Sequence, residues 1–187
     1  MDSLDPPAAG NAVTDLGWWR TWRAALRTAT AAAILDFETR YGYPPGDNGV
    51  SEPETAGVAL VAAAGLAIPA DLRKLYAVVG AVDLPDVGNG FFLHSVAQLA
   101  GGDLRQVRGR HDADVVVFAS DGGGTRYALA TPVGAPVYRL PAGQVVGGVY
   151  TSDDPCFGMA APDLATFLAG LLRAVEEFAR SGATPHL

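Results

Sequence analysis

The sequence predicts an α+β protein in which a single, mostly antiparallel sheet is flanked by helices. Three observations support this fold class. Apolar residues recur at helical spacing in the first half of the chain, short strand-like runs follow, and an amphipathic helix closes the chain. This order lacks the regular alternation of strands and helices that is typical of a doubly wound parallel sheet. We expect a flexible tail at 1–13, one domain at 14–182 and a C-terminal tail at 183–187.

A leading helix is expected over 14–40. Thr14 or Asp15 would cap it, and three arginines would share one of its faces. Its apolar residues follow at spacings of three and four, which places them on one stripe that we expect to enter the core. These residues are Trp18, Trp22, Leu26, Ala29, Ala33 and Phe37.

Three further helices are expected before the group of strand-like runs that begins at Val115. The capping-box pair Ser51 and Glu54 predicts a helix that ends at Gly65. Pro69 predicts the start of a short helix, and Ser95 is a candidate cap for another. The segments 41–49 and 83–90 are dense in turn-forming residues, and we interpret them as loops.

The strand-like runs are rich in β-branched and aromatic residues and are bounded by glycine, proline or aspartate. They comprise Phe91–Leu93, Val115–Ala119, Arg126–Ala130, Val137–Leu140 and Val145–Tyr150. Pro162 and Asp163 then open the closing helix, whose apolar face runs from Leu164 to Phe178.

The stretch VVVFASDGGGTRYALA raises the question whether its three glycines hold a phosphate or turn the chain. A phosphate loop needs a helix after the glycines and a lysine that reaches the terminal phosphates. Here the strand-like run RYALA follows, and no Gly-Lys-Ser/Thr is present. We therefore predict a hairpin turn in which Asp121 bonds the backbone.

Composition and charge narrow the class of partner. The formal net charge is −7, which disfavours binding to a nucleic-acid backbone. The run VALVAAAGLAI is about half as long as a membrane span, and the first residues lack the features of a secretory signal. The single cysteine, Cys156, cannot form an internal disulfide. These features predict a cytoplasmic protein that binds neither nucleic acid nor membrane.

No convincing catalytic, cofactor or metal site is found in the sequence, and we predict that the protein is not an enzyme. His111 with Asp112 and Asp114 is the nearest approach to a metal site, but a fourth ligand is not apparent nearby. Cys156 precedes a phenylalanine and has no obvious histidine partner, so we interpret it as a small buried hydrophobic residue.

The order of these motifs resembles the SMI1/KNR4 superfamily, also called SUKH. The resemblance covers about 51–172, and the leading helix lies outside it. Its motifs are a Leu/Ile-Pro step before a short helix, a strand that ends at an acidic-glycine turn, an aromatic strand, a Val-Tyr strand and a Phe-Leu pair in the last helix. Here they are Ile68-Pro69, Phe118 with Asp121 and Gly122 to Gly124, Tyr127-Ala128-Leu129, Val137-Tyr138 and Phe167-Leu168.

The resemblance implies an α+β domain without enzymatic activity or cofactors, acting as an immunity protein that binds a cognate bacterial toxin. The partner would be that toxin domain or another basic protein, because an acidic binder gains encounter rate from opposite charge. The candidate partner-binding residues are seven aspartates that we expect in exposed loops: Asp83, Asp86, Asp112, Asp114, Asp121, Asp153 and Asp154. The alternatives are a regulatory or scaffold protein of the same fold, or a small-ligand domain that uses the Asp121 loop or the His111 cluster. The oligomeric state is not determined by the sequence.

Overall fold

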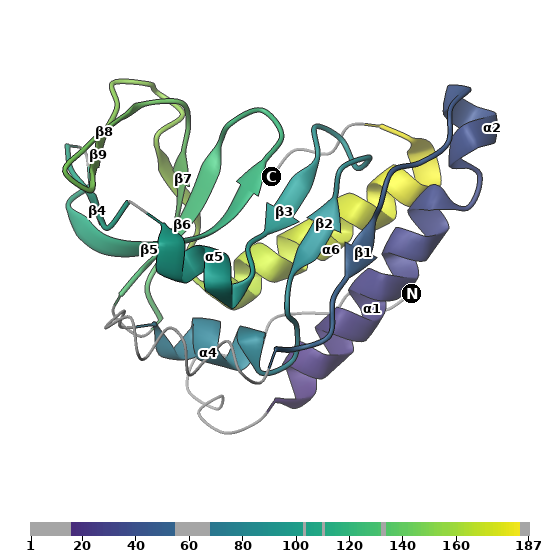
Figure 1. Cartoon of the computed structure of the whole chain (residues 1–187), viewed down its shortest axis with the longest axis horizontal. Coiled ribbons are helices and arrows are strands. Elements are labelled where there is room, and N and C mark those ends of the chain that lie inside the picture. Colours follow the sequence, from purple (N-terminus) through teal and green to yellow (C-terminus); the bar gives the residue numbers. More distant parts are fainter. Residues whose placement is uncertain (1–15, 55–67, 103, 110, 132–133, 184–187) are drawn as a thin grey trace.

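A nine-residue strand, β5 (Ala113–Asp121), lies at the centre of a ten-stranded sheet (Figure 1). The computed structural model describes residues 16–54, 68–102, 104–109, 111–131 and 134–183. Within them the chain is an α+β protein with helices packed on a large, mostly antiparallel sheet, as the sequence predicts. The expected tail at 1–13 lies outside the described residues, as do residues 55–65 of the helix expected from Ser51 to Gly65.

Three strands pair directly with β5, two of them along one edge and the third along the other. The C-terminal end of β5 pairs with β3, its N-terminal end pairs with β4, and its opposite edge pairs with β6. The strands are β1 (Gly49–Val50), β2 (Val82–Leu84), β3 (Phe91–Leu93), β4 (Gln106–Val107), β6 (Arg126–Ala130), β7 (Val137–Leu140), β8 (Gln144–Val146), β9 (Val149–Thr151) and β10 (Gly158–Ala161). Their order is β1-β2-β3-β5-β4-β9-β8, with β6, β7 and β10 continuing from the other edge of β5. Among the described strands, β4 and β9 form a parallel pair and the other pairs are antiparallel.

Two hydrophobic cores lie on opposite faces of this sheet. Alternate residues of a strand point to opposite faces, so Leu129 and Val137 join the core beneath the long helices, while Ala128 and Tyr138 join a second core. The second core lies under β4, β9 and β8, which we call the small sheet. It contains Leu104, Val107, Tyr150 and Phe157 together with residues of β5, β6 and β7. Burial on both faces explains why the central runs read as continuously apolar.

The two long helices, α1 (Gly17–Ile34) and α6 (Leu164–Ser181), pack against each other beneath the sheet (Figure 1). Trp22 Nε1 donates a buried hydrogen bond of 2.8 Å to Leu168 O. Asp163 caps α6 as predicted, because its side chain accepts from the backbone N–H of Thr166. None of the described helices is long and apolar enough to cross a membrane.

The leading helix differs from the sequence prediction in where it ends and in which residues form its buried stripe. No side chain caps α1, and the helix stops at Ile34, after which Phe37 begins the separate helix α2 (Phe37–Tyr41). Trp19 is buried, whereas Trp18 is only half-buried. At about 100° per residue, Trp19 lies closer to the middle of the buried face, and this decides which indole enters the core.

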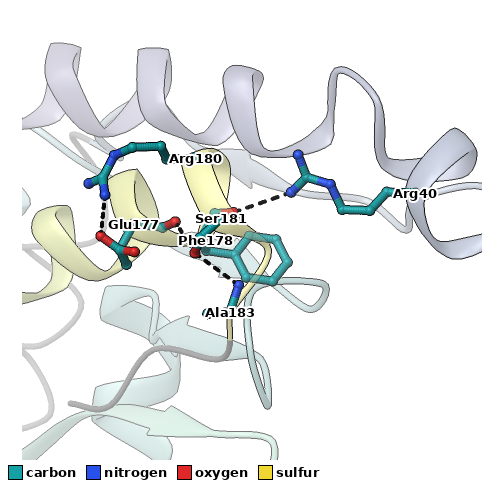
Figure 2. A network of polar contacts seen from close by, with 6 residues as sticks. All are labelled: Arg40, Glu177, Phe178, Arg180, Ser181 and Ala183. Atoms are coloured by element: carbon teal, nitrogen blue, oxygen red, sulfur yellow. Dashed lines mark hydrogen bonds and ion pairs between the residues drawn. The ribbon is translucent and has the colours of Figure 1, made fainter.

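The C-terminal end of α6 is held by α2, as Figure 2 shows. Arg40 donates to the carbonyl oxygen of Phe178, and Ser181 Oγ donates to that of Glu177. Gly182 takes a left-handed conformation, with φ of 69°, and closes the helix. A cation at this end also opposes the negative pole of the helix dipole.

The shorter helices follow the sequence more closely. Helix α4 (Ala70–Tyr76) begins after Pro69, and α5 (Val96–Gly101) begins with a complete capping box of Ser95 and Gln98. Ser51, however, does not begin a helix within the described residues. Its N–H donates to Ala81 O and its carbonyl accepts from Gly80 N, which continues the pairing of β1 and β2.

Several strands depart from the prediction. The run expected as one strand over 145–150 is a hairpin, because Gly147 and Gly148 take φ values of 58° and 83° and separate β8 from β9. Strands β1, β2, β4 and β10 were not predicted; β1 lies partly within the expected loop 41–49, and β2 overlaps the expected loop 83–90. Two of the four, β1 and β4, have only two residues, too few for a period-two pattern to appear.

The helix pair offers a test with a matched control. Trp22 and Trp19 are 0% and 2% exposed, but only the Trp22 indole has an acceptor among the described residues, whereas Trp19 Nε1 is buried without one. We expect Trp22→Phe to cost about 1–2 kcal/mol more stability than Trp19→Phe, because only the first removes a satisfied hydrogen bond. Urea unfolding followed by far-ultraviolet circular dichroism measures the difference. Equal losses would show that the bond to Leu168 does not stabilise the helix pair.

Candidate functional site

The triple glycine forms the turn of the β5–β6 hairpin, as predicted. Asp121 Oδ1 accepts from the backbone N–H groups of Gly123 and Thr125, at 2.9 and 2.8 Å. Gly124 takes a φ of 89°, which favours glycine. A strand, β6, follows the turn, so no helix begins directly after the three glycines. The carboxylate of Asp121 therefore organises the turn.

Three turns meet at this end of the sheet, and we call them together the turn-end surface: residues 43–48, 85–90 and 121–125. Gly122 N donates to Gly90 O, which joins the second and third turns. Asp86 Oδ2 accepts from Gly46 N and Asn48 Nδ2, at 2.6 and 2.5 Å, which joins the first and second. In Figure 1 the β2–β3 and β5–β6 turns lie along the same edge of the sheet.

The turn-end surface carries negative charge. Asp86 and Asp121 belong to it, and no lysine, arginine or histidine occurs in its three turns. Asp83 lies close by, but it is an exposed residue of β2 and not part of the expected loop, with Gly49 and Phe92 as its strand partners. Asp47 is also exposed here, although it was not among the seven candidates. Its position in the turn-forming run Pro-Gly-Asp-Asn could have identified it as an exposed loop residue.

The other four candidates lie around the small sheet, at the opposite end of β5. Asp114 is an exposed residue of β5 itself, which corrects its expected loop position, and its Oδ1 accepts from Gln106 Nε2. Asp112 accepts from Gly109 N, and Asp154 accepts from Cys156 N. Asp153 is exposed. Since β5 spans about 30 Å, the seven aspartates form two separate groups.

Basic residues lie among the second group, whereas the three turns of the turn-end surface contain none and Arg126 follows directly after the third turn. Arg105 lines a surface hollow together with Asp114, and Arg108 donates to Gln106 Oε1. The His111 ring contacts the rings of Tyr138 and Phe157. Among the described residues no three potential ligands come together as a metal site. The turn-end surface is therefore the more uniformly acidic of the two.

The expectation that Cys156 is buried is wrong. Cys156 is exposed, and its neighbour Phe157 enters the second core instead. The backbone explains this, because Asp154 bonds the N–H of Cys156 and the carbonyl of Asp154 accepts from Phe157 N. That tight turn directs the larger apolar side chain inward.

A polar cavity of ≈ 250 Å³ lies between α5, the start of β4 and the exposed side of β5 and β6. The polar and charged residues in its lining are Arg105, Arg126, His94, Ser120 and Gln98. None of these five was selected from the sequence, because they lie on separate elements without a recognisable spacing.

A bulge in β5 places Ser120 in this cavity. The register with β6 shifts between Val117 and Ala119, so Phe118 is the extra residue. Val117 and Ser120 both line the cavity, although strict alternation would place them on opposite faces. The residue after β3 bonds to the bulge, because His94 N donates to Phe118 O. Ser120 and His94 therefore meet, with 2.9 Å between Oγ and Nε2.

Burial lowers the pKa of His94, and the positive charge of Arg126 lowers it further. The carboxylate of Asp83 acts in the opposite direction and raises it. Arg126 is the strand partner of Ser120, which explains how its charge reaches the imidazole. Burial and Arg126 therefore favour the neutral imidazole, and one of its ring nitrogens is hydrogen-bonded to Ser120.

The electrostatics of the cavity can be tested at His94. We expect Arg126→Gln to raise the pKa of His94, because it removes a charge that disfavours the imidazolium. We expect Asp83→Asn to lower it, because it removes a charge that favours the imidazolium. Nuclear magnetic resonance titration of the imidazole Cε1–H signal, assigned by its loss in His94→Gln, measures both shifts. Shifts of the same sign in the two variants would contradict this account.

The glycine turn offers a second matched pair. A Cβ on Gly122 would lie 2.0 Å from Asn89 O, whereas a Cβ on Gly123 would meet nothing closer than Asp121 Oδ1 at 3.4 Å. We expect Gly122→Ala to cost about 1–3 kcal/mol, because backbone must move. Gly123→Ala should change stability by no more than about 0.5 kcal/mol. Thermal unfolding compares them, and a harmless Gly122→Ala would mean that the two turns are not in contact.

No protein-family model matches this sequence, and no curated protein or solved structure is significantly similar to it. The α+β fold class is thus known from the structure of the chain itself. Two features of the described residues provide grounds for functional proposals: the turn-end surface with its carboxylates, and the polar cavity beside α5.

Proposed function

We propose that this chain is a non-enzymatic immunity protein of the SMI1/KNR4 type, which neutralises a cognate bacterial toxin by binding it directly in the cytoplasm. The observation that carries the proposal is the turn-end surface. It brings three turns from distant parts of the chain into contact and presents carboxylates without a basic residue among them. Such a surface suits a basic partner, as a toxin that acts on nucleic acids would be.

The hydrogen bonds within the turn-end surface favour recognition. Asp86 and Asp121 each accept two hydrogen bonds from uncharged donors, which orient the carboxylates without removing their charge. A preorganised surface loses less conformational entropy when a partner binds. Asp47 and Asp83 are exposed beside them and add charge that can steer encounter.

The motif order from Ile68-Pro69 to Phe167-Leu168 supports the same proposal through its resemblance to SMI1/KNR4 proteins. A fold can serve several roles, so the partner has to be tested directly. The probe is the C-terminal domain of a large secreted protein encoded beside this chain. Expression of this chain should restore growth to cells that express that domain. Failure to restore growth, or a neighbourhood without such a protein, would contradict the proposal.

The turn-end surface can be separated from the acidic group at the small sheet by two triple variants. One carries Asp47→Asn, Asp83→Asn and Asp121→Asn; the control carries Asp112→Asn, Asp114→Asn and Asp153→Asn. Each removes three negative charges, which changes the formal net charge from −7 to −4, and asparagine keeps an acceptor oxygen in the turns.

We expect the turn-end variant to bind the toxin domain about tenfold more weakly at low salt, and the control to bind nearly as the parent does. The difference should shrink as salt is added, because exposed charges are screened. Isothermal titration calorimetry at two salt concentrations measures both. If the control variant loses the affinity instead, the interface lies at the small sheet.

A further inference from the structure

We infer that the cavity lined by Arg105, Arg126, Ser120 and His94 binds a small oxyanion ligand, a carboxylate or a phosphate monoester. This site is separate from the turn-end surface and goes beyond the proposed immunity function. The inference rests on which donors converge, on the bulge that positions them and on the size of the cavity.

The donors match the chemistry of an oxyanion. A guanidinium group carries a permanent positive charge and a planar set of N–H donors that fits the oxygens of carboxylate and phosphate. Arg105, the residue before β4, and Arg126, the first residue of β6, both line this one cavity. The chain has a net charge of −7, so a cavity lined by two arginines is more positively charged than the average surface.

The backbone around these donors is tied in place. Arg105 N donates to Gly148 O and its carbonyl accepts from Val115 N, so its main chain is held between the β8–β9 turn and β5. Arg105 Nη1 lies 3.3 Å from Leu104 O, which keeps the guanidinium over the segment that leaves α5. Arg126 is held in β6 opposite Ser120, with ladder partners on both sides. Rigid supports of this kind are what a binding site requires.

Ser120 and His94 extend the donor set. In the neutral tautomer with the proton on Nε2, His94 donates to Ser120 Oγ, and the Ser120 hydroxyl is then able to donate to a ligand oxygen. An anion beside this pair also favours the imidazolium, so binding and protonation of His94 support each other. Asp83 and Arg126 are the charged groups that act on this imidazole, in opposite directions.

The volume limits the ligand to a small one. A cavity of ≈ 250 Å³ is slightly below the range of about 300–1,000 Å³ that is usual for ligand pockets. The apolar side chains of Leu99, Leu104 and Val117 complete its wall. Such a site suits a short organic acid or a small phosphorylated molecule, with the anionic group at the arginines and a short carbon skeleton against the leucines.

The test is a titration of the ¹⁵N-labelled full-length chain, followed by heteronuclear correlation spectra. The probes are inorganic phosphate and succinate, added separately at matched ionic strength, with sodium chloride as the reference. We expect saturable shifts at Ser120 and His94 with one of the two probes, and the tighter probe identifies the phosphate or the carboxylate class. Saturation should also raise the pKa of His94.

Arg105→Gln and Arg126→Gln should each weaken binding by about tenfold, and Ser120→Ala by a smaller factor. Arg173→Gln is the matched control, because Arg173 is exposed on α6 and does not line the cavity. The inference is overturned if neither probe gives saturable shifts up to about 10 mM. It is also overturned if the Arg105→Gln, Arg126→Gln double variant binds as the parent does while its spectrum shows a folded chain. Neither result depends on a toxin, so it leaves the immunity proposal unaffected.

Discussion

The pairing of β5 with partners on both of its edges is the interaction on which the rest of the structure depends. Its N-terminal end pairs with β4, its C-terminal end with β3 and its other edge with β6. It therefore joins the helix-covered sheet to the small sheet, and its side chains enter both cores. Only the middle of β5 has both of its faces covered, and this explains the run of valines and Phe118 there.

The bulge at Phe118 connects this packing to the candidate cavity. With one extra residue in β5, Phe118 and Ala119 both join the helix-side core, and Ser120 turns toward the cavity beside α5. The hairpin that follows closes through Asp121, next to the β2–β3 turn. One strand thus positions both the polar cavity and part of the acidic surface. Asp83 is an exposed carboxylate next to the second turn in sequence, and its charge also acts on His94 of the cavity.

The fold was more predictable than the candidate sites. The caps of α5 and α6, the glycine turn and the strands β3, β6 and β7 follow from residues within a few positions of one another. The prediction placed Trp18 rather than Trp19 in the core, because these residues lie four and three positions before Trp22 and both spacings fit a helical stripe. Of the seven selected aspartates, Asp86 and Asp121 proved to organise turns, and Asp83 and Asp114 lie on strands. The lining of the cavity was not predicted at all.

The sequence by itself determined the α+β class, most of the helices and the turn at Gly122 to Gly124. These depend on periodicity, capping and backbone freedom, which act over a few neighbouring residues. Only the tertiary structure decided that Gly46 and Asp86 would join their turns, and that Arg105, Ser120 and His94 would share a cavity. Such contacts depend on strand order, register and one bulge. These are set by the packing of the whole chain, because each local segment can pair in more than one way.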